Sequence, residues 1–275
     1  MKEVVDNIQQ AIRVFTNACT IPILINGLDP ITRQERVGSR GSGSLFRFGD
    51  KHYIITAAHV LEDYYVASPR IGIPTSLNSK GVVTLGQCSV LTLKNPTSRW
   101  NIDIGAIELD EEHLKLLDKR YRFLSYDNIE VTQKSNKAII NGFPDSYTQY
   151  NDDVKAISVK PFCFISTFMN TEESSQIEGN NEFSFFINWG GLVFTTIDGE
   201  MLDSGLDLGG LSGAPVFQNC PCEGIWSAEK SLKFVGVQCS VSQGKWIKGV
   251  KAGYLSTFFT KIDEQISSKL REIGA

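Results

Sequence analysis

The sequence is short of several features that would point to particular functions. It holds only three histidines in 275 residues, and its 27 Lys and Arg against 31 Asp and Glu leave a net charge of −4. No apolar run approaches the roughly 18 residues that a membrane-spanning helix needs. Basic residues are scattered along the chain, without the patch that nucleic-acid binding requires. We therefore expect neither a nucleic-acid partner nor a membrane partner.

The N-terminus lacks the pattern of a secretory signal. Such a signal needs an uninterrupted apolar stretch behind a basic start, whereas acids and amides interrupt residues 1–10 every few positions. We therefore expect a cytoplasmic protein that is complete at its N-terminus. In that compartment, and in a chain large enough to bury its own core, the six cysteines are expected to stay free thiols.

Hydrophobic periodicity predicts a β-rich chain with a helix at each end. Apolar residues recur at helical spacing over 2–17 and over 256–273, which predicts two amphipathic helices. Between them, runs of strand character are separated by clusters of Gly, Pro, Asn, Asp or Ser. These runs lie at 20–26, 82–93, 103–109, 136–141, 154–168, 183–195, 213–217, 232–241 and 248–254.

The remaining segments fit the same pattern. Residues 45–56 alternate around a turn at Gly49-Asp50, which predicts a β-hairpin. Residues 38–44 are rich in Gly and Ser and are expected to form a loop. Residues 111–134 are expected to be helical or irregular and to separate two β-rich halves. The whole is typical of an all-β barrel or sandwich.

Two positions suit nucleophilic catalysis. A serine hydroxyl needs a base to take its proton, a carboxylate to orient that base, and donors for the oxyanion that forms. His59 follows a predicted strand and two small residues. By contrast, His52 belongs to the alternating pattern of a strand, and His113 lies in a charged segment. Ser212 is flanked by glycines, which let the backbone turn tightly and could aim the amides of Gly210 and Ser212 at one point.

Three motifs, in this order, resemble those of trypsin-like serine proteases. Residues 56–59 are similar to the histidine motif of that family, and residues 101–107 to its aspartate motif around Asp103. Residues 210–216 are similar to its Gly-x-Ser-Gly-x-Pro nucleophile motif, and the order His, Asp, Ser is that of chymotrypsin-type enzymes. The stretch 41–46 resembles the strand lead-in of bacterial members, so the motif style is closest to bacterial intracellular trypsin-like peptidase domains.

The resemblance covers most of the chain and implies its fold. We expect an all-β protein with two antiparallel six-stranded β-barrels, to which the two terminal helices are added. The first unit would span residues 1–120 and hold His59 and Asp103. The second would span residues 121–275 and hold Ser212 together with the C-terminal helix.

The resemblance also implies an endopeptidase mechanism. Ser212 would attack the scissile carbonyl, and His59 would act as general base and then as general acid. Asp103 would orient the imidazole, and the amides of Gly210 and Ser212 would form the oxyanion hole. This chemistry needs no metal and no cofactor, and its partner is a protein or peptide substrate.

Leu211 is a departure from the family pattern. Zymogen-type members have an aspartate at this position, which pairs with a new N-terminus after activation cleavage. Leucine cannot form that ion pair, so we expect no activation of this type. Control would then come from narrow specificity, from loop ordering or from a regulatory protein partner.

The resemblance places the substrate-binding residues in two segments. Leu206 and Asp207 precede the nucleophile, and Cys239, Ser240 and Val241 belong to the strand that would pair with substrate. Val241 stands where many members have glycine, which would narrow the pocket. This favours a small or medium apolar side chain before the cleaved bond, although Asp207 could instead favour a basic one.

Other functions remain as alternatives. The chain could be a protease-like module that binds peptides or acts as a scaffold, or an enzyme that prefers esters to peptides. Residues 220–222 hold two cysteines, but a structural zinc site usually needs a second close pair. The glycine-rich residues 38–44 lack the Gly-Lys-Ser/Thr ending of a phosphate-binding loop.

Overall fold

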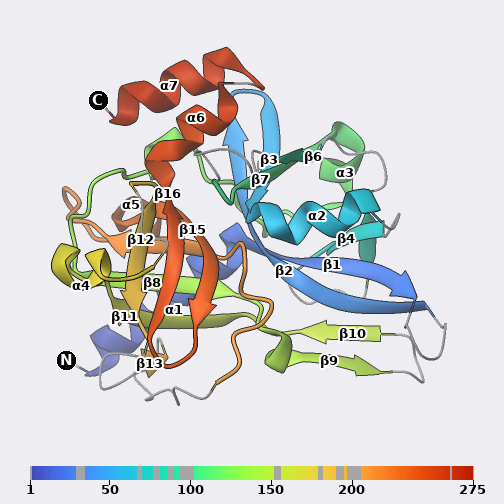
Figure 1. Cartoon of the computed structure of the whole chain (residues 1–275), viewed down its shortest axis with the longest axis horizontal. Coiled ribbons are helices and arrows are strands. Elements are labelled where there is room, and N and C mark those ends of the chain that lie inside the picture. Colours follow the sequence, from blue (N-terminus) through green and yellow to red (C-terminus); the bar gives the residue numbers. More distant parts are fainter. Residues whose placement is uncertain are drawn as a thin grey trace.

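The chain folds into two curled antiparallel β-sheets that lie side by side (Figure 1). The computed structural model describes residues 2–28, 35–66, 70–76, 81–85, 90–92, 102–151, 156–178, 182–189, 195–196, 206–260 and 262–274. Each sheet has seven strands within these ranges, one more than the six expected, because each continues at an edge with a strand of two or three residues. The expected all-β double-barrel architecture with terminal helices is confirmed.

The first sheet comes from the N-terminal half. Its strands are β1 (Thr20–Leu28), β2 (Glu35–Phe48), β3 (Lys51–Thr56), β4 (Arg70–Pro74), β5 (Val82–Thr84), β6 (Val90–Thr92) and β7 (Gly105–Leu109). They lie in the order β5-β4-β1-β2-β3-β7-β6. The predicted hairpin is the β2–β3 pair, and its turn places Gly49 at a φ of +63°, a conformation that glycine adopts without strain.

The second sheet comes from the C-terminal half. Its strands are β8 (Lys137–Gly142), β11 (Phe162–Thr167), β12 (Ser184–Asn188), β13 (Thr195–Thr196), β14 (Pro215–Asn219), β15 (Leu232–Ser242) and β16 (Trp246–Lys251), in the order β12-β16-β15-β14-β8-β11-β13. A separate hairpin pairs β9 (Thr148–Asn151) with β10 (Ala156–Val159). The single run expected over 154–168 is therefore divided, with Pro161, which has no amide hydrogen to donate, between β10 and β11.

The glycine-rich residues 38–44 are not a loop, and that prediction was wrong. They form the middle of β2 and pair with β1 over most of their length. A β-carbon on Gly41 would come within 2.8 Å of both the Ser212 carbonyl oxygen and the Val60 side chain. The small residues therefore serve close packing, because other elements lie directly against the backbone of this strand.

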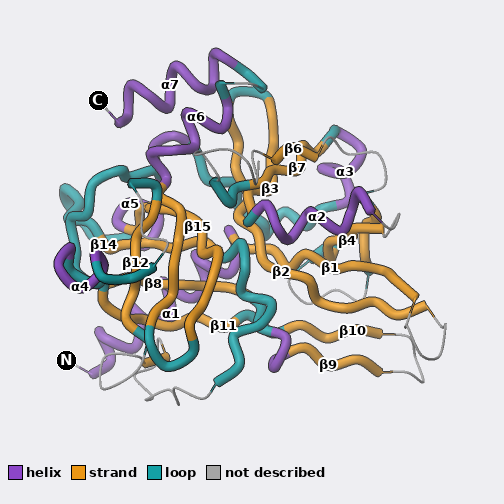
Figure 2. The backbone as a smooth tube through the Cα atoms, viewed as in Figure 1, coloured by secondary structure: helices purple, strands orange, loops and turns teal. Residues whose placement is uncertain are grey.

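Helices lie around the two sheets (Figure 2). They are α1 (Lys2–Cys19), α2 (Ala58–Val66), α3 (Glu111–Leu116), α4 (Thr171–Ser175), α5 (Ala228–Ser231), α6 (Leu255–Phe259) and α7 (Glu264–Gly274), with 3₁₀ turns at Tyr126–Asn128, Asp145–Tyr147 and Ala252–Tyr254. Helix α1 packs on the second sheet, where the ring of Phe15 lies 6.1 Å from that of Phe217. The boundary expected near residue 120 stays a prediction.

The C-terminal helix is broken, although one helix was expected over 256–273. Helix α6 ends at Phe259, and the amide of Asp263 donates to the Phe259 carbonyl at 2.8 Å before α7 starts. The break lets Phe259 pack edge-on against Phe48 and Tyr53 of the first sheet, with ring centroids 5.2 Å from each. The C-terminal segment thus covers the first sheet, while α1 covers the second.

The ionisation of Asp263 makes the stability of this docked segment depend on pH. Its carboxylate forms an ion pair with Lys51 at 3.0 Å and accepts the amides of Gln265 and Ile266 at the start of α7. Lys51 and then the helix amides hold the pKa of Asp263 below its usual value. The ionised carboxylate therefore stabilises the folded state.

We expect Asp263→Asn to lower the melting temperature at pH 7, because it removes the charge. A lowered carboxyl pKa stabilises the fold above the unfolded value of about 4, and this contribution is lost as the pH falls through the folded value. The difference from wild type should shrink below about pH 4 in thermal unfolding. Glu272→Gln, on an exposed residue of α7, is the control. A difference that grows on acidification would contradict the expectation.

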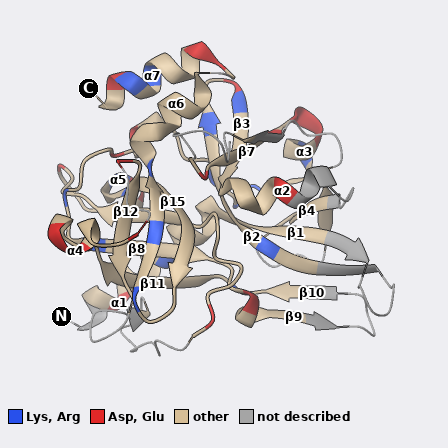
Figure 3. Ribbon diagram, viewed as in Figure 1, with Lys and Arg blue, Asp and Glu red and all other residues tan. Residues whose placement is uncertain are grey.

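Charged side chains of both signs are scattered over the two halves (Figure 3). None of the helices in the described ranges is long and apolar enough to cross a bilayer. Cys19, Cys220, Cys222 and Cys239 are free thiols, and Cys88 lies outside the described residues.

Candidate active site

Asp103 holds His59 by two hydrogen bonds. His59 lies in the first turn of α2, directly after β3, and Asp103 lies just before β7. The His59 amide donates to Asp103 Oδ1 at 3.0 Å, and His59 Nδ1 lies 2.8 Å from Asp103 Oδ2. A carboxylate at the start of a helix is favoured by the helix dipole. With Nδ1 donating to Asp103, Nε2 is left to accept a proton.

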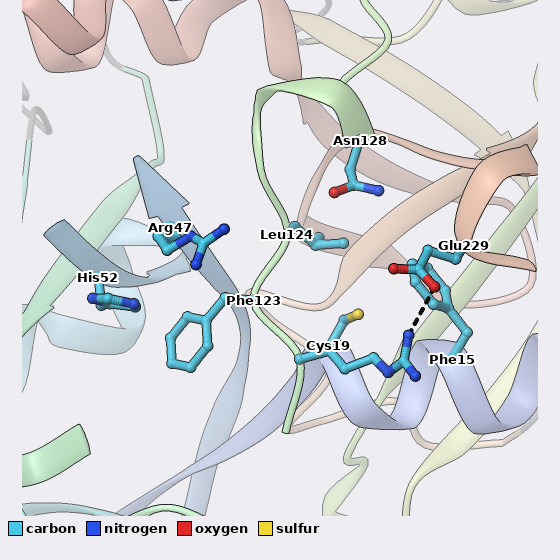
Figure 4. Close-up of a pocket in the computed structure, with 9 residues that line it drawn as sticks. Phe15, Cys19, Arg47, His52, Phe123, Leu124, Asn128 and Glu229 are labelled. Carbon is cyan, nitrogen blue, oxygen red and sulfur yellow. Dashed lines mark hydrogen bonds and ion pairs between the residues drawn. The ribbon is translucent and has the colours of Figure 1, made fainter. Parts of the chain in front are cut away.

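The other two histidines lie elsewhere. His52, the cross-strand partner of Arg47, borders a separate hollow of about 250 Å³, where its ring stands edge-on to Phe123 (Figure 4). Burial, followed by the Arg47 charge, lowers the pKa of His52. His113 pairs with Asp110 at the start of α3. His59 is therefore the histidine that the structure places at the candidate site.

The turn that carries Ser212 is fixed through its carbonyl groups. Gly210 and Gly213 take φ values of +82° and +91°, which side-chain-bearing residues rarely adopt. Four successive carbonyls accept hydrogen bonds: Gly209 from the Asp145 amide at 2.6 Å, Gly210 from Ser42 Oγ at 3.0 Å, Leu211 from the Ala214 amide at 2.8 Å and Ser212 from the Ser42 amide at 2.8 Å.

These anchors orient two amides. In a trans peptide the C=O and the N–H point in opposite directions. The bond to the Gly209 carbonyl therefore turns the Gly210 amide away from Asp145, and the bond to the Leu211 carbonyl turns the Ser212 amide away from Ala214. The described residues supply no acceptor to either amide. Two such donors on one tight turn are what an oxyanion hole requires.

Strand β2 joins the histidine and serine elements. Gly41 lies against both Val60, next to His59, and the Ser212 carbonyl. Within the described part of the chain, no hydrogen bond links the side chains of His59 and Ser212. Catalytic hydrogen bonds are often long without substrate and tighten only in the complex, so this geometry is compatible with a base and its nucleophile.

Two other ionisable side chains border the site. Burial, followed by the Asp103 charge, raises the pKa of Cys239 to about 12, so the thiol stays neutral. Its Sγ lies 3.6 Å from the Lys248 carbonyl oxygen. Burial and the Asp207 carboxylate also raise the pKa of Asp145, which lies beneath the Gly210 turn, although Ser39 and Arg40 oppose this shift.

A hollow of about 270 Å³ opens beside Ser212. It brings together Leu206, Asp207 and Val241 from the two segments that the sequence singled out. Cys239 and Ser240 precede Val241 on β15 but are not among the residues that line this hollow. The remaining lining residues are Trp189, Leu208, Gly209 and Gln243.

Sequence reasoning missed several of these contributors. Trp189 is only 2% exposed, yet it lines the hollow. Ser42 and Asp145 hold the nucleophile turn, but each lies more than 60 residues before Ser212 in a segment with no catalytic motif. No local signal marks such long-range contacts. The described residues contain no cluster of three or more His, Cys, Asp or Glu suited to a metal.

Comparisons with known proteins show the fold. No protein-family model matches the chain, and no curated protein matches it. Among solved structures, the chain is similar to the crystal structure of an inactivated protease paralogue, S-I1, of the scabies mite. The two share 16% identity over 92% of this chain and 96% of that chain, with a TM-score of 0.54. At this identity the likeness shows the chymotrypsin-like double-barrel fold alone.

Proposed function

We propose that this chain is a serine endopeptidase of the trypsin-like type. The observation that carries the proposal is one constellation on the protease-like fold. His59 is paired with Asp103, and the turn of Ser212 presents two amides without an acceptor among the described residues. Base, orienting carboxylate, nucleophile and oxyanion donors are the four parts that acyl transfer by a serine needs.

Each part has a defined step. Ser212 Oγ attacks the scissile carbonyl carbon while His59 Nε2 takes its proton, and Asp103 stabilises the imidazolium that forms. The amides of Gly210 and Ser212 donate to the oxyanion. As the carbon–nitrogen bond breaks, His59 gives its proton to the leaving amine and Ser212 keeps the acyl group. Water, deprotonated by His59, then releases the acid and restores the hydroxyl.

The same proposal includes activity without N-terminal cleavage. Leu211 is fully buried in the core of the second sheet. Its apolar side chain cannot form an ion pair with an N-terminus released by cleavage. For specificity, we propose a small or medium apolar side chain before the cleaved bond, since Leu206, Val241 and Trp189 line the hollow. Asp207 is engaged in part by the Gly209 amide at 2.9 Å.

Labelling with a fluorophosphonate tests the proposal. We expect one adduct on full-length protein by intact mass, mapped to Ser212 and absent from Ser212→Ala, because only an activated serine attacks such a probe. Turnover of matched peptide and ester substrates would then distinguish a peptidase from an esterase. A well-folded protein that takes no adduct would overturn the proposal. Labelling that occurs only after proteolytic cleavage would contradict the proposed activity of the uncleaved chain.

A binding role is the second candidate. It is favoured by the similar solved structure, which is that of an inactivated protease paralogue, and by the lack of a hydrogen bond between His59 and Ser212 in the described residues. In this case the hollow beside Ser212 would hold a peptide without cleaving it. Peptide binding by Ser212→Ala and by wild type with equal affinity, and with no turnover by wild type, would support this candidate.

A further inference from the structure

Ser42 is the point where the first sheet meets the nucleophile turn. Its side chain is fully buried, and its hydroxyl donates to the Gly210 carbonyl at 3.0 Å while accepting the Phe143 amide at 2.9 Å. Its own amide donates to the Ser212 carbonyl at 2.8 Å. One small residue therefore supplies two of the four bonds that fix the turn.

The Ser42 hydroxyl also supports the hydrogen bond from the Asp145 amide to the Gly209 carbonyl. By holding the Phe143 amide, it fixes the start of the segment whose Asp145 amide binds the Gly209 carbonyl. That bond sets the direction of the Gly210 amide. Thr56 Oγ1 in turn donates to the Ser42 carbonyl at 2.7 Å, which ties this contact to the strand just before His59.

We infer that Ser42 is a positioning residue that keeps the oxyanion hole formed by holding the Gly210 and Ser212 carbonyls. The inference rests on the proposed function. Ser42 does not touch the reacting atoms and acts through the Gly210 and Ser212 peptides. Without its hydroxyl, the Gly210 carbonyl and the Phe143 amide would lose their partner in a buried place, so the turn would relax to satisfy them elsewhere.

Ser42→Ala tests this role against a matched control on the same strand. Ser44 is also fully buried, and its hydroxyl has no hydrogen-bond partner among the described residues. Ser44→Ala therefore removes a buried hydroxyl without breaking a hydrogen bond. Saturation kinetics of fluorophosphonate labelling separate the maximal rate from the half-saturating probe concentration. Hydrogen exchange over residues 206–217, followed by mass spectrometry, reports on the turn whether or not the protein is active.

For Ser42→Ala we expect the maximal labelling rate to fall roughly 10- to 100-fold, since the hole is displaced but not removed. The half-saturating probe concentration should stay near that of wild type, and exchange over 206–217 should speed up. Ser44→Ala should match wild type in all three. Equal labelling and exchange in Ser42→Ala and wild type would overturn the inference, as would equal losses in both variants.

Two further outcomes remain decisive. If wild type takes no adduct, the proposed function fails, and exchange alone then decides whether Ser42 holds the turn. If Ser42→Ala does not fold, Ser42→Cys replaces it, because a thiol is a weaker donor than a hydroxyl. We then expect slower labelling and faster exchange over 206–217 than in wild type, and values equal to wild type would overturn the inference.

Discussion

Replacing Asp103 by asparagine is expected to lower the rate of acyl transfer about 10⁴-fold while the fold stays intact. An asparagine oxygen can still accept the His59 amide, which lies 3.0 Å from Asp103 Oδ1. Its NH₂ group would then face Nδ1, 2.8 Å from Asp103 Oδ2 in the structure. That contact requires Nδ1 to accept and puts the proton on Nε2, so His59 cannot take the proton of Ser212.

The chain offers a matched control for this substitution. Asp110 also pairs with a histidine, His113, at the exposed start of α3. Asp110→Asn should therefore leave the fluorophosphonate labelling rate within about twofold of wild type, since the pair is no part of the machinery. Labelling of Asp103→Asn within tenfold of wild type would show that the carboxylate does not set the tautomer of a catalytic base.

Gly210→Ala should give the second large effect, a labelling rate lowered by about 10²- to 10³-fold. Gly210 has a φ of +82°, which strains a residue with a β-carbon. The added carbon would also lie 2.8 Å from the Phe143 carbonyl oxygen and 2.9 Å from the Asp145 amide. The turn must shift to avoid both, and the shift breaks the bond from Asp145 to the Gly209 carbonyl that orients the Gly210 amide.

Gly209→Ala is the control for Gly210→Ala, because it adds the same methyl group to the neighbouring residue of the turn. The atoms nearest to its β-carbon would be carboxylate atoms of Asp145 and Asp207, at 3.3 Å, and those side-chain ends can move. Gly209 also lacks the positive φ of its neighbour. For Gly209→Ala we expect labelling within a few-fold of wild type and a melting temperature close to that of wild type. Equal losses of labelling in the two would mean that the oxyanion hole is not formed by the Gly210 amide.

The parts of the site that the sequence revealed are those for which chemistry fixes the residue type. An imidazole, a carboxylate and a hydroxyl in family order pointed to His59, Asp103 and Ser212, and the structure pairs the first two directly. The hairpin at Gly49 and the helix at residues 2–17 were also predictable, because turn chemistry and apolar spacing are local properties.

The parts that could not be predicted depend on distant neighbours. Residues 38–44 have the composition of a loop, and only the closeness of Val60 and the Ser212 backbone explains small residues within a strand. The break between α6 and α7 leaves the apolar spacing unchanged, so periodicity cannot report it. The anchoring roles of Ser42 and Asp145 arise from contacts across 168 and 64 positions, respectively, which no window along the chain samples.

The crossed placement of the terminal segments makes each sheet depend on an element that is distant from it in the chain. Helix α1 precedes the first sheet yet packs on the second, while α6 and α7 follow the second sheet yet cover Phe48 and Tyr53 of the first. Until residues 255–274 have been synthesised, the sheet that holds His59 and Asp103 has an open apolar side. A growing chain can therefore cover the apolar side of the first sheet only after the strands of the second sheet have been made.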